Sequence, residues 1–488
     1  MPKLHKLLIG VKCENKDTLP NANIESLSCN SKEIKKNCLF AALRGRSTDG
    51  HNYIAEAVSR GVRAVISEKD FDCPPSVIKI IVDNSRDALG VLLGNFYKKN
   101  EKLKLIGITG TNGKTTISLL INSILTEAGY ETAVIGTLGY RLAGAGFKGL
   151  KNTTPGAIKL HSLLNEMKER SIGYSVMEVS SHALDQRRVQ DLNFQAAIFS
   201  NLSRDHLDYH KNMKNYLAAK LRLFEGLPAG GIAVINRDDK VFEQLKKASA
   251  ARLVTYAVFN KADFKAVDIK IGLNKSEFLI KTPSANLAVN SRLTGMHNVY
   301  NILAAASWAC SEGISPVNVK RGIEKLKKVP GRLERVNERQ QFKVFVDYAH
   351  TPDALEKVLG FLREMVGDRG KVITVFGCGG DRDRTKRPKM AKAAAMYSDL
   401  VIVTNDNPRR EKPLAIFKDI RAGFSEAGFK KYKFMAGRRK AIETAFKSAQ
   451  KNDVVLIAGK GHEKTQIFKN RTMPFDDVEA AKKILRKR

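Results

Sequence analysis

The sequence predicts an α/β protein built from three domains. Short apolar runs of the kind that form buried strands alternate with amphipathic, helix-like segments along most of the chain. The 488 residues are about three times the length of a typical domain, and 43% of them are hydrophobic, which is enough for several cores. The N-terminus does not resemble a secretory signal, and no apolar run approaches the roughly 18 residues of a membrane span. We therefore expect a soluble, cytoplasmic protein without membrane insertion.

Residues 1–102 are predicted to form a small mixed α/β domain. Apolar runs at residues 37–42 and 62–66 indicate strands, and residues 52–59 between them indicate a helix. The polar stretch at residues 98–102 is typical of a linker. The first domain boundary is placed there.

Residues 103–330 are predicted to form a central domain with a parallel sheet. A strand at residues 103–106 leads through a glycine-rich loop into a helix, and further strands are expected at residues 132–135, 174–177, 196–199 and 232–235. Amphipathic segments separate these strands, which is the pattern of parallel strands connected by helices. Helices at residues 299–311 and 316–326 close the domain before Pro330 and Gly331, which we interpret as a hinge.

Residues 331–488 are predicted to form a Rossmann-like α/β domain. Strands are expected at residues 343–346, 372–376, 400–404 and 454–457. Each ends in a polar or glycine-bearing loop, and ligands of open α/β sheets bind at that edge. The second and third domains are therefore expected to face each other across a cleft.

The loop between the first central strand and its helix has the composition of a nucleotide-phosphate cradle. Its glycines allow backbone N–H groups to converge on phosphate oxygens at a helix N-terminus. A lysine of such a loop reaches the outer phosphates, and the next hydroxyl ligates magnesium. The spacing departs from the general P-loop pattern, because Ile108 stands where the first glycine is expected. The predicted ATP-binding residues are Gly110, Thr111, Asn112, Gly113, Lys114, Thr115 and Thr116.

Carboxylates and imidazoles follow two other central strands. Glu178 and His182 come after one strand, and Asp205, His206 and His210 come after another. Each alone is as compatible with a hydrogen-bonded loop residue or an ion pair as with a metal ligand. Their position beside the phosphate loop favours a magnesium site, since Mg²⁺ prefers oxygen ligands.

The formal net charge of +34 has two interpretations. It would suit a nucleic-acid partner, or it could be a solvated basic surface. Basic residues recur along the whole chain, for example in the run Lys325 to Lys328, and no nucleic-acid-binding motif accompanies them. A basic surface without a nucleic-acid partner is therefore favoured. The six cysteines lack a Cys-x-x-Cys pair, so we expect free thiols and no zinc site.

Five motifs in this order resemble those of the Mur ligase family over essentially the whole chain. They are Thr109-Gly-Thr-Asn-Gly-Lys-Thr115, Asn152-Thr-Thr-Pro155, Met177-Glu-Val-Ser-Ser-His182, Asp205-His-Leu-Asp-Tyr-His210 and Asp347-Tyr-Ala-His-Thr-Pro352. The resemblance implies ATP-dependent amide formation through an acyl phosphate, in peptidoglycan precursor synthesis. The small-molecule partners would be ATP, UDP-N-acetylmuramoyl-L-alanyl-D-glutamate and meso-2,6-diaminopimelate, acted on by a monomer.

The resemblance also implies roles for individual residues. Thr115, Glu178 and His206 match magnesium positions of the family, and Lys220 matches a lysine that is carbamylated to supply another magnesium ligand. Lys114, Lys220 and His206 would be catalytic. Asn298, Arg332 and Asp347 match positions around ATP.

Two further sets match family positions for the substrates. The UDP-sugar peptide would contact Ser31, Arg46, Ser47, Thr48, Asn152, Thr153, Thr154, Ser180, Gln186 and Arg188. The first-domain match is imperfect, since Asn30-Ser31-Lys32 replaces the family's Asp-Ser-Arg. Diaminopimelate would contact Arg382, Asp406, Asn407, Pro408, Arg409, Gly459 and Glu463.

Three questions stay open on the sequence. Arg410 follows Arg409, so either guanidinium could bind the second carboxylate of diaminopimelate. A ligase that adds lysine or another diamino acid is an alternative, which Arg409 disfavours. A basic P-loop NTPase that acts on nucleic acid is the remote alternative, in which the motifs after Lys114 would have no role.

Overall fold

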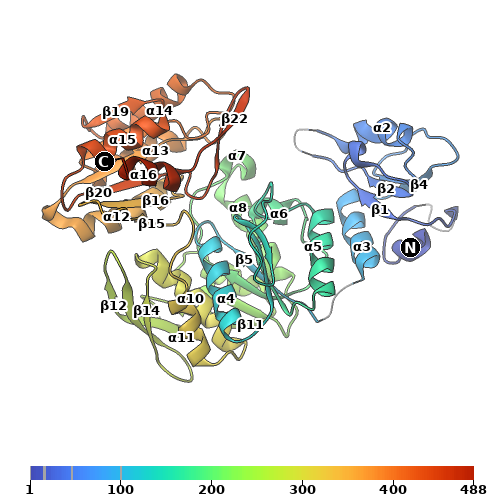
Figure 1. Ribbon diagram of the computed structural model, residues 1–488. Coiled ribbons are helices and arrows are strands. Elements are labelled where there is room, and N and C mark those ends of the chain that lie inside the picture. Colours follow the sequence, from blue (N-terminus) through green and yellow to red (C-terminus); the bar gives the residue numbers. More distant parts are fainter. Residues whose placement is uncertain (1, 15–17, 46–47, 99–101, 488) are drawn as a thin grey trace.

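The computed structural model describes residues 2–14, 18–45, 48–98 and 102–487. The described strands form three main sheets and one small hairpin. Figure 1 shows the first sheet (blue) and the third (orange to red) on opposite sides of a central body (cyan to yellow). The predicted class, α/β with three domains, is confirmed.

The N-terminal sheet has four parallel strands in the order β1-β2-β3-β4. Side chains of α1 and α3 pack on one face and those of α2 on the other. The predicted helix is shorter than expected, because its first turn is the 3₁₀ helix η3. The elements are α1 (Leu4–Leu7), β1 (Ser26–Ser28), η2 (Ser31–Glu33), β2 (Cys38–Ala41), η3 (Gly50–Tyr53), α2 (Ile54–Ser59), β3 (Ala64–Ser67), β4 (Ile78–Ile81) and α3 (Ser85–Tyr97).

The central sheet has ten strands in the order β14-β13-β12-β11-β10-β9-β5-β8-β6-β7. The strands from β12 to β6 are parallel, which agrees with the predicted parallel sheet, although β11 and β12 were not among the expected strands. β7 at one end and β13 and β14 at the other are antiparallel additions that the sequence analysis also missed. The strands are β5 (Lys104–Thr109), β6 (Thr132–Gly136), β7 (Gly139–Leu142), β8 (Tyr174–Glu178), β9 (Phe194–Phe199), β10 (Ile232–Asn236), β11 (Arg252–Ala257), β12 (Phe264–Ile271), β13 (Ser276–Lys281) and β14 (Leu287–Ser291).

Helices cover both faces of this sheet because its strands alternate apolar side chains to either side. Ile106 and Ile108 of β5 pack with α4, α10 and α11, whereas Leu105 packs with α5 and α8. The helices are α4 (Lys114–Glu127), α5 (Ala157–Glu169), α6 (Ser181–Asp185), α7 (Leu207–His210), α8 (Met213–Glu225), α9 (Phe242–Ala248), α10 (Met296–Ser311) and α11 (Pro316–Lys325).

The third sheet has the order β15-β16-β20-β17-β18-β19, and all its strands except β15 are parallel. Helices α12, α13 and α14 pack on one face and α15 and α16 on the other. The elements are β15 (Glu334–Val336), β16 (Lys343–Asp347), α12 (Pro352–Val366), η4 (Gly367–Arg369), β17 (Val372–Phe376), α13 (Lys386–Tyr397), β18 (Leu400–Thr404), α14 (Pro413–Glu426), β19 (Tyr432–Met435), α15 (Arg438–Ser448), β20 (Val454–Ala458), β21 (Thr465–Phe468), β22 (Arg471–Pro474) and α16 (Asp477–Leu485).

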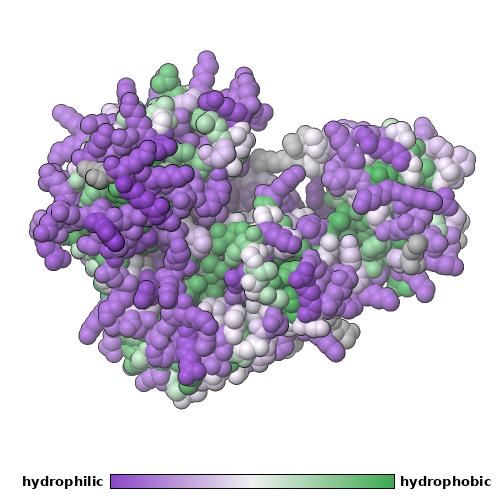
Figure 2. Space-filling view, in the orientation of Figure 1, coloured by the Kyte–Doolittle hydropathy of each residue, from purple (hydrophilic) through white to green (hydrophobic). Residues whose placement is uncertain are grey.

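Polar and charged residues dominate the surface in Figure 2. Among the described helices, none is long and apolar enough to cross a membrane. The basic residues therefore lie mostly where water solvates them, as the even distribution along the sequence predicts.

Candidate active site

The glycine-rich loop links β5 to α4 and depends on two glycines with positive φ. Gly110 has φ +138° and Gly113 has φ +92°. A Cβ at Gly110 would lie 2.0 Å from Ser200 Oγ, and a Cβ at Gly113 would lie 2.3 Å from Asn301 Oδ1. Only glycine combines these dihedral angles with such close neighbours. The loop is thus fixed by both backbone conformation and packing.

Two lysines converge on the carbonyl oxygen of Gly110. Lys114 Nζ donates to the carbonyls of Gly110 and Thr111, both at 2.8 Å. Lys220 Nζ, from α8, donates to the same Gly110 carbonyl at 2.8 Å, and this residue is only 1% exposed. Burial lowers the pKa of both lysines, and the neighbouring Lys114 charge depresses the pKa of Lys220 further. The neutral, nucleophilic form of the Lys220 amine is therefore more accessible than that of an exposed lysine.

Glu178 is the last residue of β8 and is 1% exposed. Its carboxylate accepts hydrogen bonds from Thr115 Oγ1 at 3.0 Å, Thr137 Oγ1 at 2.8 Å and the Thr137 backbone N–H at 2.9 Å. The structure thus brings together two of the predicted magnesium ligands, Thr115 and Glu178. Thr137, which orients the carboxylate, was missed because it follows a different strand, β6.

His206 lies in the loop after β9 with φ +54°. Its backbone N–H donates to Asp205 Oδ1 at 2.9 Å, and its side chain is 43% exposed. Partial burial lowers the pKa of His206 to about 4, with Lys114 and Lys220 contributing to the shift. The neighbouring His182 has its pKa lowered to about 3 by burial and by the nearby rings of His206 and His210. These imidazoles are neutral at pH 7 and can act as ligands.

The predicted magnesium ligands provide a fitting set of donors only when Lys220 is modified. Within the described part of the chain, no three His, Cys, Asp or Glu side chains are grouped closely enough to hold a metal by themselves. Thr115 and Glu178 already form one oxygen pair, and a carbamate at Lys220 would add oxygens beside the phosphate loop. That modification would also place an anion beside the Lys114 side chain.

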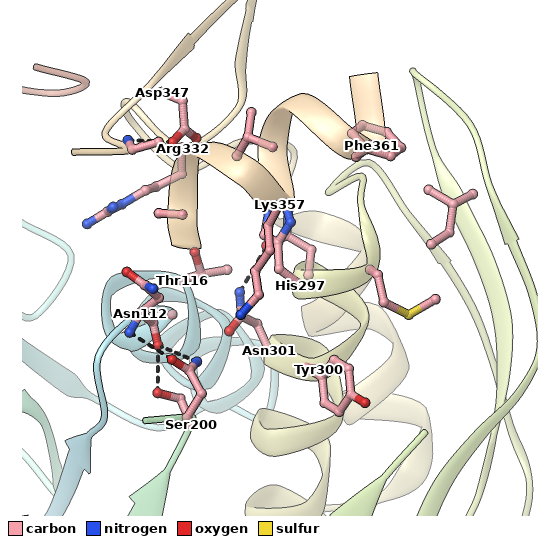
Figure 3. Close-up of a pocket in the computed structure, with 18 of the residues that line it drawn as sticks. Asn112, Thr116, Ser200, His297, Tyr300, Asn301, Arg332, Asp347, Lys357 and Phe361 are labelled. Atoms are coloured by element: carbon pink, nitrogen blue, oxygen red, sulfur yellow. Dashed lines mark hydrogen bonds between the residues drawn. The ribbon is translucent and has the colours of Figure 1, made fainter. Parts of the chain in front are cut away.

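A cavity of about 610 Å³ opens between the central and third domains (Figure 3). Asn112, Gly113 and Thr116 line it from the phosphate loop, and Arg332 and Asp347 line it from the third domain. The predicted nucleotide residues from three distant segments therefore meet in one space. Residues that the sequence analysis missed complete the lining: Ser200, Asn201, Asp238, Asp239, His297, Tyr300, Asn301, Lys357 and Phe361.

Asn298 lies on the wall of this cavity and is 3% exposed. Its side chain donates to the carbonyl of Thr294 at 2.8 Å and accepts from Asn301 Nδ2 at 3.0 Å. Arg332 stacks on the ring of Tyr348 with its Cζ 4.5 Å from the centroid. Both polar side chains are therefore held in place before any ligand binds.

Most of the predicted UDP-sugar residues of the central domain form one hydrogen-bonded group. Thr154 Oγ1 donates to the carbonyl of Glu178 at 2.8 Å and accepts from the Ser180 N–H at 3.0 Å. Arg188 Nη1 donates to the carbonyl of Thr154 at 2.8 Å and Arg188 Nη2 to Gln186 Oε1 at 2.6 Å. Thr153 contacts this group through Thr137 Oγ1 at 3.2 Å, whereas Asn152 is exposed.

The predicted first-domain residues lie apart from that group. Ser31 Oγ donates to Glu56 Oε2 at 2.7 Å, and Thr48 is exposed. Arg46 and Ser47 lie outside the described residues. The direct contact with the central group comes instead from Arg86, which the sequence analysis missed and whose Nη1 donates to the carbonyl of Gln186 at 3.4 Å.

The loop after β18 carries the predicted diaminopimelate residues and is largely buried. Asp406 and Asn407 are 7% and 3% exposed. Arg409 has φ +53°, and its Nη1 donates to the carbonyl of Gly380 at 2.8 Å. Arg410 instead points outward, with its side chain 80% exposed and paired with Asp381. Of the two candidates, Arg409 is the guanidinium built into the loop.

Two guanidinium groups lie close together in this region. Burial lowers the pKa of Arg409, and the charge of Arg382 lowers it further. Arg382 is exposed and comes from the loop after β17. Paired cations of this kind are suited to a carboxylate ligand.

Glu463 lies across the same loop. Its Oε2 accepts from Asn407 Nδ2 at 2.8 Å and from Lys460 Nζ at 2.9 Å. Gly459 has φ +112°, and a Cβ there would lie 2.8 Å from Asp406 Oδ2. The predicted donor residues from three loops therefore meet at the carboxyl edge of the third sheet.

Two structural supports of the donor loop were missed by the sequence analysis: the buried side chain of Arg387 and the strand β21. Arg387 is fully buried and bonds Glu411, Asp419 and the carbonyl of Gly379, which ties the Arg382 loop to the segment after Arg409. The β21 strand is bonded to the donor loop through Gln466 and Ile467. Neither feature has a sequence signature, because each partner is distant in the chain.

Three family models match consecutive parts of the chain. They are described as the Mur ligase family catalytic domain (residues 23–97), the Mur ligase middle domain (residues 108–309) and the Mur ligase glutamate ligase domain (residues 331–461).

Individual relatives match over almost the full length. The chain is 40% identical to the UDP-N-acetylmuramoyl-L-alanyl-D-glutamate–2,6-diaminopimelate ligase of Syntrophomonas wolfei, over 99% of both chains. A solved structure of a ligase with that name superposes with a TM-score of 0.67 at 33% identity, over 95% of both chains. The MurF ligase of Thermotoga maritima in complex with ADP has a TM-score of 0.65 at 18% identity, over 95% of this chain and 98% of that chain, and shows the shared fold alone.

Proposed function

This chain belongs to the Mur ligase family, and from that premise we propose that it joins meso-2,6-diaminopimelate to the D-glutamate of UDP-N-acetylmuramoyl-L-alanyl-D-glutamate. The reaction is an ATP-dependent amide ligation in the cytoplasmic synthesis of peptidoglycan precursors. Residues 1–102 would bind the UDP-sugar, residues 103–330 ATP, and residues 331–488 the incoming amino acid, in a monomer. The remote NTPase hypothesis is not favoured, since all three matched models are Mur ligase models.

The observation that carries the choice of amino acid is the pairing of Arg409 and Arg382 beside Glu463. Diaminopimelate has two carboxylates and two ammonium groups, whereas lysine has one carboxylate fewer. Two guanidinium groups would neutralise the additional carboxylate, and Glu463 would accept from an ammonium group. A lysine-adding enzyme would leave the partly buried guanidinium of Arg409 without its anion, which is unfavourable.

ATP would occupy the cavity between the central and third domains. The phosphates would lie along the loop from Gly110 to Thr116, and the adenosine would lie against Asn298, Arg332 and Asp347. Support comes from the position of these residues around one cavity and from the ADP bound in a structurally similar ligase. Asp347 accepts from the backbone N–H groups of Leu333 and Ala349, so its carboxylate is oriented to receive hydroxyl groups.

Amide formation would proceed in two displacement steps. A carboxylate oxygen of the substrate's D-glutamate attacks the γ-phosphorus of ATP, the bond to the β,γ-bridging oxygen breaks, and ADP leaves. The amine of diaminopimelate then attacks the acyl carbon, phosphate leaves with the bonding pair, and the amine loses a proton to form the amide. Lys114 would neutralise charge on the transferring phosphoryl group. The rest of the catalysis would come from aligning the bound substrates for each displacement.

Magnesium would be held by Thr115, Glu178, His206 and the carbamate of Lys220. When bound, it would neutralise phosphate charge during the first step. Burial of Lys220 beside Lys114 supports the carbamate, because a neutral amine is the form that reacts with carbon dioxide. Glu178 needs no rearrangement, since three hydrogen bonds already orient its carboxylate.

The test is a parallel assay of phosphate release and product mass. ATP, magnesium and UDP-N-acetylmuramoyl-L-alanyl-D-glutamate are supplied with either meso-diaminopimelate or L-lysine. We expect turnover with diaminopimelate and a mass increase of one diaminopimelate residue. Turnover with lysine alone would retain the ligase but overturn the role of Arg409. Absence of turnover with both amino acids in a folded, ATP-binding protein would overturn the proposal.

A further inference from the structure

A second cavity, of about 650 Å³, shares two lining residues with the nucleotide cavity. Asn298 and Arg332 belong to the lining of both. Its walls come from the β12–β13 turn, β14 and the segment after it, the segment that follows α11, and β15 and β16 of the third domain. None of the proposed catalytic or substrate roles uses this second cavity.

Its lining is strongly cationic. Six basic residues face a single acidic one, Glu334. Glu334 is already engaged, because Oε1 accepts from Lys328 Nζ and Oε2 accepts from the Gly331 N–H, both at 2.9 Å. The basic residues are Lys275, Arg292, Lys327, Lys328, Arg332 and Arg335. Lys275 is paired as well, because its Nζ lies 2.9 Å from Glu277 Oε1. The excess positive charge of the cavity therefore comes from the remaining basic residues.

Two of these cations have no anionic partner among the described residues. Arg292 follows β14, and Lys327 belongs to the basic run Lys325 to Lys328. Both are exposed, and neither forms a hydrogen bond or ion pair with any residue that the structure describes. Like charges held in one concavity repel each other unless an anion is bound between them.

The floor of the cavity is apolar and ordered. Leu293, Leu333 and Phe345 are 5%, 7% and 1% exposed, and all three line the space. A concave site with a fixed apolar floor and converging charges has the usual construction of a small-molecule site. A surface patch that serves only solubility would not require such a concavity.

We propose that this second cavity binds a small phosphate-bearing anion that carries at least two negative charges. Lysine ammonium and arginine guanidinium groups together are the usual partners of phosphate oxygens. The cavity is large enough for more than one phosphate group, and its floor can accept an apolar substituent. This inference does not depend on the proposed ligase reaction.

An anion bound in this second cavity would link the central domain to the third domain. Lys275 and Arg292 belong to the central domain, Arg335 belongs to the third, and Lys327 and Lys328 lie in the segment between them. An anion that contacts all three parts would resist any change in their separation. It would also act on Arg332, which lines the nucleotide cavity as well.

The test uses inorganic pyrophosphate as the probe, measured by isothermal titration calorimetry. The nucleotide cavity is first saturated with magnesium and the β,γ-methylene analogue of ATP, so that the phosphate loop is occupied. We expect one pyrophosphate per chain in the wild type and at least tenfold weaker binding in an Arg292→Gln/Lys327→Gln variant. Orthophosphate is expected to bind more weakly, and citrate distinguishes phosphate recognition from a general preference for anions.

The matched control is Lys246→Gln/Lys247→Gln, which removes the same charge from exposed positions of α9 outside the cavity. It should bind pyrophosphate as the wild type does. Equal weakening in both variants would mean that only the overall positive field acts, and would overturn the proposal. So would absence of binding in the wild type, or citrate binding as tightly as pyrophosphate.

Hydrogen exchange provides a second readout that is independent of binding heat. Pyrophosphate should slow amide exchange in the segment between α11 and β15 in the wild type and in the control variant. The Arg292→Gln/Lys327→Gln variant should show no such slowing. Slowing confined to the phosphate loop would locate the anion elsewhere and contradict the proposal.

Discussion

The phosphate-loop region and the donor-loop region both concentrate cations, but they use different residues. Around the phosphate loop the cations are lysines, and Lys114 and Lys220 share one carbonyl oxygen in a buried setting that lowers both pKa values. Around the donor loop they are arginines, and Arg382 and Arg409 lie near the surface of the third domain.

The difference follows from the chemistry of the two groups. A lysine gives up its proton under burial and then becomes a nucleophile, whereas a guanidinium remains charged and presents a planar fork to a carboxylate. The lysine region is therefore suited to a modification and to charge compensation during reaction. The arginine region is suited to recognition. Each prediction below tests one side of this contrast.

The largest effect is expected from Lys220→Met, which removes the only amine in the proposed metal-ligand set. We expect kcat to fall about 1000-fold, as for loss of a group that stabilises transition-state charge, with folding retained. Steady-state phosphate release gives kcat, and ¹³C NMR with labelled bicarbonate detects the carbamate. Lys214→Met, at an exposed position on the same helix, is the control and should retain activity. A Lys220→Met enzyme within tenfold of the wild type would refute the modification.

The second-largest effect is expected from Arg409→Lys, which replaces a guanidinium of the donor loop with an ammonium group. We expect kcat/KM for diaminopimelate to fall about 100-fold, since an ammonium cannot form the bidentate pair, while KM for ATP is unchanged. Competition between diaminopimelate and lysine as donors measures the loss of specificity. Arg410→Lys should change kcat/KM less than about twofold, because its guanidinium is exposed. The reverse ranking of the two variants would assign recognition to Arg410.

A smaller effect is expected from Arg387→Met, beneath the donor loop. Arg387 contacts no proposed substrate atom but bonds Glu411, Asp419 and Gly379, so its loss should loosen the loop of Arg382. We expect KM for diaminopimelate to rise about tenfold while KM for ATP stays constant. Arg384→Met removes an exposed partner of the same Asp419 and should change KM little. Equal increases in both KM values would indicate general destabilisation.

The smallest effect is the contribution of His182, beside the phosphate loop, to the pH dependence of stability. The pKa of His182 is lowered from 6.5 to about 3, so the unfolded chain binds a proton below pH 6.5 that the folded chain does not. Stability therefore falls as pH decreases from about 6.5, by roughly 1 kcal/mol at pH 5.5 for one such histidine. Differential scanning calorimetry should show a lower Tm at pH 5.5 than at pH 7 and a smaller decrease for His182→Gln. His5→Gln, at an exposed position, should leave the decrease unchanged.

Much of the fold was predictable because the buried parallel strands are short apolar runs. β8, β9, β17, β18 and β20 lie within one or two residues of their predicted bounds. Several of the strands that were missed are at or near sheet edges or in the hairpin, where polar residues alternate with apolar ones. In β12, β13, β21 and β22 half or more of the residues are in contact with solvent, and β14 alternates buried with exposed residues. β11 was missed too, although it is an interior strand with four of its six residues buried.

The site was predictable wherever a motif follows a strand. Glu178 and Asp406 were singled out for that reason, and parallel strands bring their carboxyl ends to one edge. The residues that orient them were not predictable. Thr137, Arg86 and Arg387 come from other segments and share no spacing with the groups they contact.

The sequence by itself determined most of the buried parallel strands, the phosphate loop and the residue types available at the ends of those strands. These are local properties, set by periodicity and by backbone conformations that only glycine adopts readily. The tertiary structure decided which of two adjacent arginines is built into the donor loop, which lysines share a carbonyl oxygen, and where uncompensated charge gathers. Burial and charge proximity depend on segments far apart in the chain, and only packing brings those segments together.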